Sequence, residues 1–181
     1  MKLQGVHHAA YRCRDARETV HWYRDHLGMD FVLAIAENQV PSTKAPDPYM
    51  HVFMDAGGGN VLAFFEIPNS PDMGFDPNTP RWVQHIAFEV DTLEEVHQWR
   101  DRLAAARVPI ETNRVDSGVK VGKTITSVYF NDPNGHRLEI CVAHKLDPDA
   151  LEKEAWASLA QWNADKASGQ LRAPRKVETV E

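Results

Sequence analysis

Two histidines stand at equivalent places in a segment that occurs twice in the chain. The segments are VHHAAYRCRDARETVHWYRDHL and VQHIAFEVDTLEEVHQWRDRL. In their alignment His8 falls on His85, whereas the neighbouring His7 falls on Gln84. Adjacent residues of a strand point to opposite faces, so only one of His7 and His8 can face a shared interior. A two-fold repeat would bring His8 and His85 toward one point, as a bidentate metal site requires.

Two carboxylates extend this pattern to a set of metal ligands. Glu66 lies in the apolar run VLAFFEI, and Glu139 lies in RLEI near the end of the second repeat. An unpaired carboxylate is costly to bury in such a run, and a cation facing it removes that cost. Two neutral imidazoles with one or two carboxylates suit one divalent cation such as Fe(II), Mn(II), Zn(II) or Ni(II).

Each repeat predicts a strand followed by a helix. Asp15 with Glu18, and Thr92 with Glu95, each predict a capping box at a helix start, in which side chain and backbone exchange hydrogen bonds. Gly28 is a residue able to take positive φ, which favours the end of the first helix there. The segments FVLAIAE, HVFMDA and VLAFFEI follow the first helix, and VPIETNRV, TSVYFND and RLEICVA follow the second. Each half therefore predicts the order β-α-β-β-β within an α+β fold.

The breaks between these segments predict the domain organisation. We expect a first βαβββ module at 1–68, a Pro-rich and Asn-rich linker at 69–81, and a second module at 82–145. Residues 146–181 are expected to form a C-terminal helix, begun by Asp147-Pro148, and a tail whose last dozen residues are disordered.

Composition excludes several classes of function. The chain has 181 residues and a net charge of −6, without the clustered basic residues that a nucleic-acid surface needs. It has no apolar run of the roughly 20 residues that span a bilayer, and no secretory signal is recognised. Cys13 and Cys141 are expected to be reduced thiols, and the protein is expected to be cytoplasmic. A small molecule is the expected partner.

The chain resembles the vicinal oxygen chelate superfamily over about residues 3–145. The resemblance is carried by the doubled β-α-β-β-β order and by HHAAYRCRD, VQHIAFEVD and YFNDPNGHRLEI. It implies two paired modules that form a cupped, mostly antiparallel half-barrel around a metal, and it implies a homodimer. His8, His85 and Glu139 match the 2-His-1-carboxylate ligands. Glu66 matches the fourth ligand that glyoxalase-like members use and ring-cleaving members leave open.

The resemblance favours an extradiol-type dioxygenase that cleaves a catechol-like ring with Fe(II). Tyr129 matches the tyrosine that hydrogen-bonds substrate in ring-cleaving members, and Tyr49, Phe53 and Phe64 are expected to line an aromatic pocket. This chain has Lys120 where ring-cleaving relatives have a histidine nine positions before the tyrosine, and we expect Lys120 to stabilise an anionic intermediate.

Two other functions stay open. A second histidine of the ring-cleaving relatives is replaced by Ser70. A glyoxalase-like or epimerase-like lyase or isomerase needs neither that histidine nor O2, since its metal would stabilise an enediolate while Glu66 or Glu139 moves a proton. A bleomycin-binding type of resistance protein would use the same fold without metal or catalysis.

Overall fold

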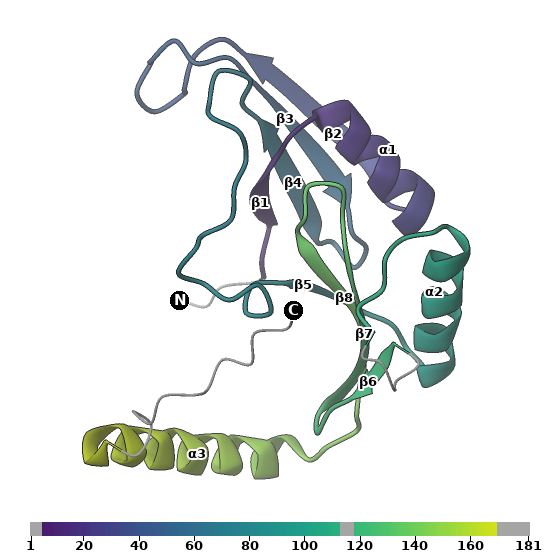
Figure 1. Cartoon of the computed structure of the whole chain (residues 1–181), viewed down its shortest axis with the longest axis vertical. Coiled ribbons are helices and arrows are strands. Elements are labelled where there is room, and N and C mark those ends of the chain that lie inside the picture. Colours follow the sequence, from purple (N-terminus) through teal and green to yellow (C-terminus); the bar gives the residue numbers. More distant parts are fainter. Residues whose placement is uncertain (1–4, 113–117, 170–181) are drawn as a thin grey trace, which may run out of the picture. The chain divides into compact units, whose positions relative to one another are not determined.

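The computed structural model describes residues 5–112 and 118–169 (Figure 1). The chain divides into two compact units, Met1–Ala143 and His144–Glu181.

The first module forms a four-stranded sheet with one helix. Its strands follow the order β1-β4-β3-β2, with β1 parallel to β4 and the other pairs antiparallel. The elements are β1 (His8–Cys13), α1 (Ala16–Leu27), β2 (Asp30–Glu37), β3 (Tyr49–Asp55) and β4 (Val61–Glu66).

The second module repeats that topology, with strand order β5-β8-β7-β6 and β5 parallel to β8. Its elements are β5 (Ile86–Glu89), α2 (Leu93–Ala105), β6 (Val119–Val121), β7 (Ile125–Asn131) and β8 (Arg137–Ala143). The predicted α+β fold with two mostly antiparallel sheets is confirmed.

The segment VPIETNRV differs from its prediction as a strand. In its described part, Ile110 makes an isolated bridge to Phe130, and the paired strand β6 comes later, at Val119–Val121. Pro109 has no backbone N–H for a ladder, which disfavours a regular strand there. The rest of the predicted strand lies outside the described residues.

The predicted helix starts are present, and one has the complete capping box. Thr92 and Glu95 exchange both hydrogen bonds at the start of α2. At the start of α1, the Asp15 side chain accepts a hydrogen bond from the N–H of Glu18. Gly28 ends α1 with φ of 71°, the left-handed conformation predicted for it.

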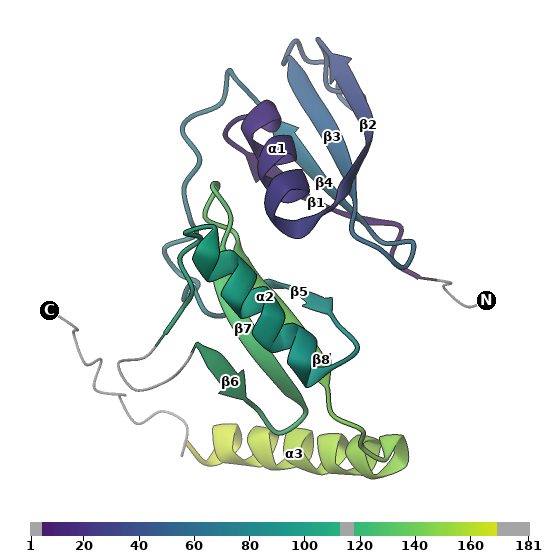
Figure 2. The same cartoon turned by 90° about the vertical axis from the view of Figure 1, so that its right-hand side faces the viewer.

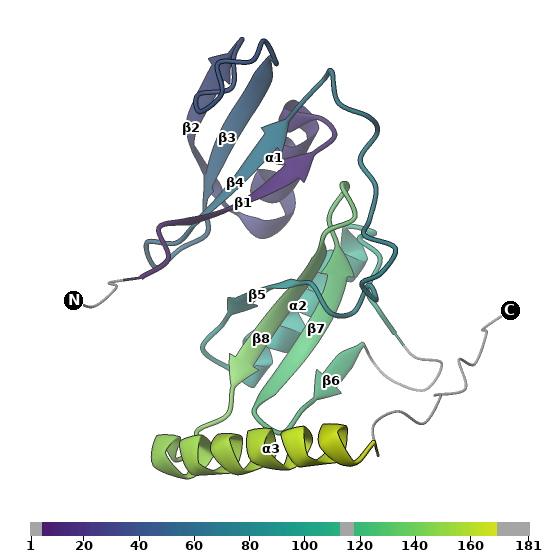
Figure 3. The same ribbon diagram turned by 90° about the vertical axis from the view of Figure 1, so that its left-hand side faces the viewer.

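Each helix covers one face of its own sheet. α2 lies in front of β7 and β8 in Figure 2 and behind them in Figure 3, and α1 is related to its sheet in the same way. The core lies between helix and sheet, where side chains such as Tyr23, Phe64, Leu103 and Phe130 are fully buried. Cys13 and Cys141 are buried free thiols, as expected.

Helix α1 contacts the turn between β7 and β8. The Tyr23 hydroxyl donates to Oδ2 of Asp132 over 3.1 Å, and the Asn134 amide donates to Oγ1 of Thr19 over the same distance. His136 Nε2 lies 2.7 Å from the carbonyl oxygen of Arg12. The Asp-Pro-Asn-Gly turn therefore joins the second module to the helix of the first.

The second unit contains α3 (Pro148–Ser168), which begins at the predicted Asp147 cap. No side chain of this helix is buried. The tail expected to be disordered lies outside the described residues. Among the helices that the structure describes, none has the length and apolar character needed to cross a membrane.

Candidate metal centre

His85 and Glu139 form a pair of potential ligands in the second module. Nε2 of His85 lies 3.1 Å from Oε2 of Glu139. Two ligand atoms that each lie about 2.1 Å from one cation, at about a right angle, are about 3.0 Å apart. The spacing of the two atoms therefore fits adjacent positions on a single divalent cation.

Surrounding groups orient both members of this ligand pair. His85 directly precedes β5, and its Nδ1 lies 3.1 Å from the carbonyl oxygen of Val83. A proton on Nδ1 would leave Nε2 as a lone-pair donor, the arrangement in which histidine binds metals. Oε1 of Glu139 accepts a hydrogen bond from the Ser127 hydroxyl, which leaves Oε2 directed at His85.

The burial of Glu139 is a second reason to place a cation here. Its side chain is 1% exposed, and His85 is the only ion-pair partner described for it. A buried carboxylate is costly without a charged partner. One nitrogen and one oxygen donor are also the ligand types preferred by the cations expected from the sequence. The residues present therefore fit a divalent metal.

Tyr129 and the positively charged side chains of Arg137 and Lys120 flank the ligand pair on the same face of the sheet. Tyr129 pairs with Glu139 across β7 and β8, and burial, followed by the Glu139 carboxylate, raises the pKa of its hydroxyl. The Arg137 guanidinium lies 3.8 Å from the Tyr129 ring centre, and Lys120 Nζ lies 5.1 Å from it. The Glu111 carboxylate accepts two hydrogen bonds of 2.8 Å from Arg137 and forms an ion pair of 3.6 Å with Lys120.

His8 lies in the first module and is not joined to the ligand pair. Its described neighbours are His7, with the two Nδ1 atoms 2.9 Å apart, and the Phe53 ring, 6.0 Å away between centres. Within residues 5–112 and 118–169, no group of three His, Cys, Asp or Glu side chains is placed to hold one metal ion. The described chain thus brings together two of the three expected ligands.

Glu66 lies on the opposite face of its sheet from His8. Its partner across β1 and β4 is Cys13, five residues after His8, so the two side chains point to opposite faces. Oε2 of Glu66 accepts a 2.7 Å hydrogen bond from the backbone N–H of Ala16, in the first turn of α1. This carboxylate therefore caps a helix, and we omit it from the proposed ligands.

The predicted aromatic pocket residues divide between the two faces of the first sheet. Phe53 and Tyr49 lie on the face of the first sheet that carries His8, whereas the buried Val52 lies on the opposite face. Phe64 is fully buried on the other face, where its ring centre lies 4.9 Å from that of Tyr23. Phe64 belongs to the core and cannot line a pocket beside His8.

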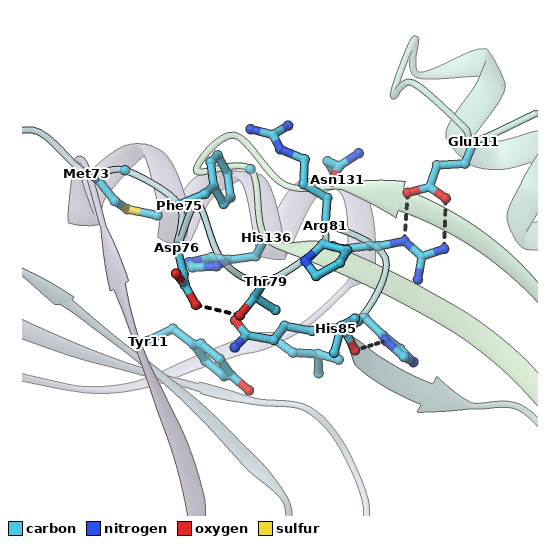
Figure 4. A pocket seen from close by; sticks show the side chains of 17 residues that line it. Tyr11, Met73, Phe75, Asp76, Thr79, Arg81, His85, Glu111, Asn131 and His136 are labelled. Atoms are coloured by element: carbon cyan, nitrogen blue, oxygen red, sulfur yellow. Dashed lines mark hydrogen bonds and ion pairs between the residues drawn. The ribbon is translucent and has the colours of Figure 1, made fainter. Parts of the chain in front are cut away.

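A cavity of about 690 Å³ meets the ligand pair from the His85 side (Figure 4). Tyr11, Phe75, Arg81 and His136 line it together with His85. Glu139 and Tyr129 are not among its lining residues, so the cavity reaches only one member of the pair.

The fold defines a protein of two βαβββ modules, the second of which brings Nε2 of His85 and Oε2 of Glu139 together. A family model, the Glyoxalase/Bleomycin resistance protein/Dioxygenase superfamily, matches residues 5–140. The chain belongs to that superfamily.

Two curated relatives show how diverse the similar proteins are. The chain is 27% identical over 143 residues to the Bacillus subtilis protein named "Putative ring-cleaving dioxygenase MhqA", covering 76% of this chain but only 40% of the relative. It is also 27% identical over 153 residues to the metallothiol transferase FosB of Staphylococcus haemolyticus, covering 84% of this chain and 94% of the relative.

Solved structures support the same fold. A lactoylglutathione lyase from Agrobacterium tumefaciens superposes with a TM-score of 0.54 at 23% identity, covering 78% of this chain and 96% of that one. A glyoxylase/bleomycin resistance protein/dioxygenase domain from Frankia superposes with a TM-score of 0.59 at 18% identity, covering 79% and 100% of the two chains. These likenesses concern the fold alone.

Proposed function

We propose that this protein is a metal-dependent enzyme that cleaves a catechol-like ring, with Fe(II) as its cation and His8, His85 and Glu139 as ligands. The observation that carries the proposal is the 3.1 Å spacing between Nε2 of His85 and Oε2 of the buried Glu139. A divalent cation bound there would stabilise negative charge on two neighbouring substrate oxygens.

The number of ligands favours ring cleavage over the glyoxalase-like alternative. In the second sheet, Glu139 pairs with Ala87, two residues after His85. In the first sheet, the residue two positions after His8 pairs with Ala63, and the Ala63 side chain has no ligand atom. Three protein ligands leave positions for two substrate oxygens and O2, whereas a fourth protein ligand would occupy one of them.

We propose that two chains share each site in a homodimer. Within the described chain His8 is not joined to His85 and Glu139, so a second copy would supply the missing histidine. The first sheet has the exposed apolar surface that such an interface needs, because every residue of β2 is exposed and Phe31, Val32 and Leu33 are about half exposed.

The residues around the ligand pair have distinct roles in this proposal. Tyr129 lies beside Glu139 on the ligand-bearing face and donates a hydrogen bond to a substrate oxygen. Lys120 and Arg137 add positive charge near that oxygen, although Glu111 offsets part of it. Burial of Glu139 among Ser127 and Tyr129 excludes water from the carboxylate.

Elemental analysis of purified protein tests the ligand set. Fe(II) supplied anaerobically should bind the wild-type protein and be lost from His8→Ala, His85→Ala and Glu139→Ala, with circular dichroism showing that each variant folds. Equal metal content in all four proteins would exclude the site.

A mixing experiment tests whether the site is shared. His8→Ala and Glu139→Ala each lack metal alone, but a dimer with one chain of each kind would contain one intact site. Random pairing should therefore restore about a quarter of the wild-type metal content. No restoration in dimers shown by mass spectrometry to be mixed would assign all three ligands to one chain.

Oxygen dependence tests the reaction. Catechol should be consumed with O2 uptake by the Fe(II) protein and not under argon. Turnover of an α-hydroxyketone or a thiohemiacetal without O2 would instead support the lyase alternative.

A further inference from the structure

Helix α3 carries three large apolar side chains that are exposed. Trp156, Leu159 and Trp162 are 65%, 51% and 52% exposed. The two tryptophans stand three residues before and three residues after Leu159, so at 3.6 residues per turn each lies about 60° from it, on opposite sides. The three side chains therefore form one face of the helix, which we call the Trp-Leu-Trp face. Tryptophan is among the residues that contribute most to protein interfaces.

Opposite charges stand at the two ends of the Trp-Leu-Trp face. Glu152 precedes Leu159 by seven residues, and Lys166 follows it by seven. Because two helical turns contain about 7.2 residues, both charged residues lie within about 20° of Leu159 around the helix axis. Oε1 of Glu152 accepts a 3.4 Å hydrogen bond from Nε1 of Trp156. The face thus runs from a carboxylate, through three apolar side chains, to an ammonium group.

This arrangement is complementary to itself when it is reversed. In an antiparallel pair of α3 helices with a two-fold axis at Leu159, each residue meets the one that is equally far from Leu159 in the other direction. Glu152 then lies opposite the partner's Lys166, and Trp156 lies level with the partner's Trp162. A parallel pair would instead set each charge against its own copy. Charge complementarity therefore favours a second α3, in antiparallel orientation, as the partner of this face.

The Trp-Leu-Trp face lies outside the part of the chain that matches the family model. That match ends at residue 140, whereas α3 spans Pro148–Ser168. No residue of this helix is buried. The face is thus separate from the two βαβββ modules that define the superfamily.

We propose that α3 is a docking surface for a second copy of this chain, and that two α3 helices pair antiparallel about Leu159. The inference does not depend on the proposed metal site. The three apolar side chains would remove about 600 Å² from water in the two chains together, against roughly 1,600 Å² for a stable interface of standard size. The contact is therefore weak alone, and it adds to any other surface that joins the same two chains.

A disulfide trap detects such a contact and tests the position of the axis. In two packed helices whose axes lie about 10 Å apart, Cα atoms that face each other across a two-fold axis are about 5 Å apart, within the range of a disulfide. Leu159→Cys should therefore form a disulfide-linked dimer when the full-length protein is oxidised with diamide. Wild-type protein should not, because Cys13 and Cys141 are buried.

Ala157→Cys is the matched control for this trap. Ala157 is exposed on the same helix, and two residues along a helix place it about 160° from Leu159 around the axis. Its thiol should remain unpaired under the same conditions. Circular dichroism shows whether each variant keeps its helices.

Charge reversal tests the antiparallel register. In the Leu159→Cys background, Glu152→Lys and Lys166→Glu should each slow disulfide formation about fivefold, since two favourable charge pairs become two like-charge pairs. The variant with both reversals should return to the original rate, and so should a mixture of the two single reversals, because each restores two pairs of opposite charge. Rates that none of these changes alters would contradict the antiparallel register.

Three further outcomes would overturn the inference. No disulfide dimer from folded Leu159→Cys would show that two α3 helices do not meet at this residue. Equal dimer formation by Ala157→Cys would mean random collision rather than a defined face. A Leu159→Cys thiol that reacts with a maleimide much more slowly than that of Ala157→Cys, in protein too dilute to associate, would show that the face packs against its own chain.

Discussion

Ala63 lies in the first sheet at the place that Glu139 occupies in the second. Ala63 pairs with Ala10, two residues after His8, and Glu139 pairs with Ala87, two residues after His85. The duplicated modules therefore differ in the number of proposed metal ligands that they carry. The first carries His8 and the second carries His85 and Glu139, so neither module alone holds the three proposed ligands.

Replacement of Glu66 tests whether this carboxylate acts as a cap or as a ligand. Glu66→Ala removes the acceptor for the N–H of Ala16 and should lower the free energy of unfolding by about 1 kcal/mol, the usual cost of a lost cap. Metal content should not change. Urea denaturation and elemental analysis measure the two effects, and loss of metal from a folded variant would return Glu66 to the ligand set.

Gly135 should be intolerant of any side chain. Its φ is +87°, and a Cβ there would lie 2.6 Å from Cζ of Phe75, which belongs to the cavity wall. Gly135→Ala should lower the free energy of unfolding by about 2 kcal/mol or more, because strain in the backbone adds to the clash.

Gly57→Ala separates these two causes. Gly57 has the same φ of +87°, but nothing lies within 4 Å of the position that a methyl group would take there. Its substitution should cost only about 1 kcal/mol. The excess at Gly135 should disappear when Phe75 is also replaced by Ala, and an excess that persists in the double variant would show that Phe75 is not the cause.

Tyr23 links the modules and should make stability depend on alkaline pH. Its buried hydroxyl donates to Asp132, and burial, followed by the Asp132 charge, raises its pKa well above the ordinary 10.0. The folded state thus holds this proton more tightly than the unfolded state. The stabilisation is complete below about pH 10 and declines as the pH rises further.

Tyr23→Phe should remove this dependence. The variant should lose about 1–3 kcal/mol at pH 8, because a buried carboxylate loses a donor. The difference from wild type should shrink between pH 8 and pH 10.5 in urea denaturation. A constant difference over that range would mean that Tyr23 ionises equally in both states.

The repeat in the sequence was sufficient to predict the two modules, their helix starts and the pairing of His85 with Glu139. It could not assign the faces of single residues in β4, because one step of strand register exchanges the two faces. Glu66 and Phe64 lie on the face of the first sheet opposite to His8, whereas Phe65 lies on the face that carries His8. Alternation in HVFMDA does place His51 with Phe53, but their proximity to His8 depends on pairing across three strands.

Glu111 should stabilise the folded state only while it is ionised. The Arg137 hydrogen bonds lower its pKa below the ordinary 4.5, so the folded state releases this proton more readily than the unfolded state. The stabilisation is present above about pH 4.5 and is lost as the pH falls through the lower folded value. Glu111→Gln should therefore be less stable than wild type at pH 7, with a difference that vanishes by acid pH.

The ion pair of Arg100 and Asp101 provides the control for Glu111. It is short, at 2.7 Å, but the Asp101 side chain is 69% exposed, and exposed pairs contribute little because water and salt screen them. Asp101→Asn should change stability slightly and equally at pH 7 and pH 4. Should both variants instead lose the same stability at both pH values, the Glu111 effect would come from general surface charge. Only a paired and partly buried carboxylate gives a stability difference that disappears when that carboxylate is protonated.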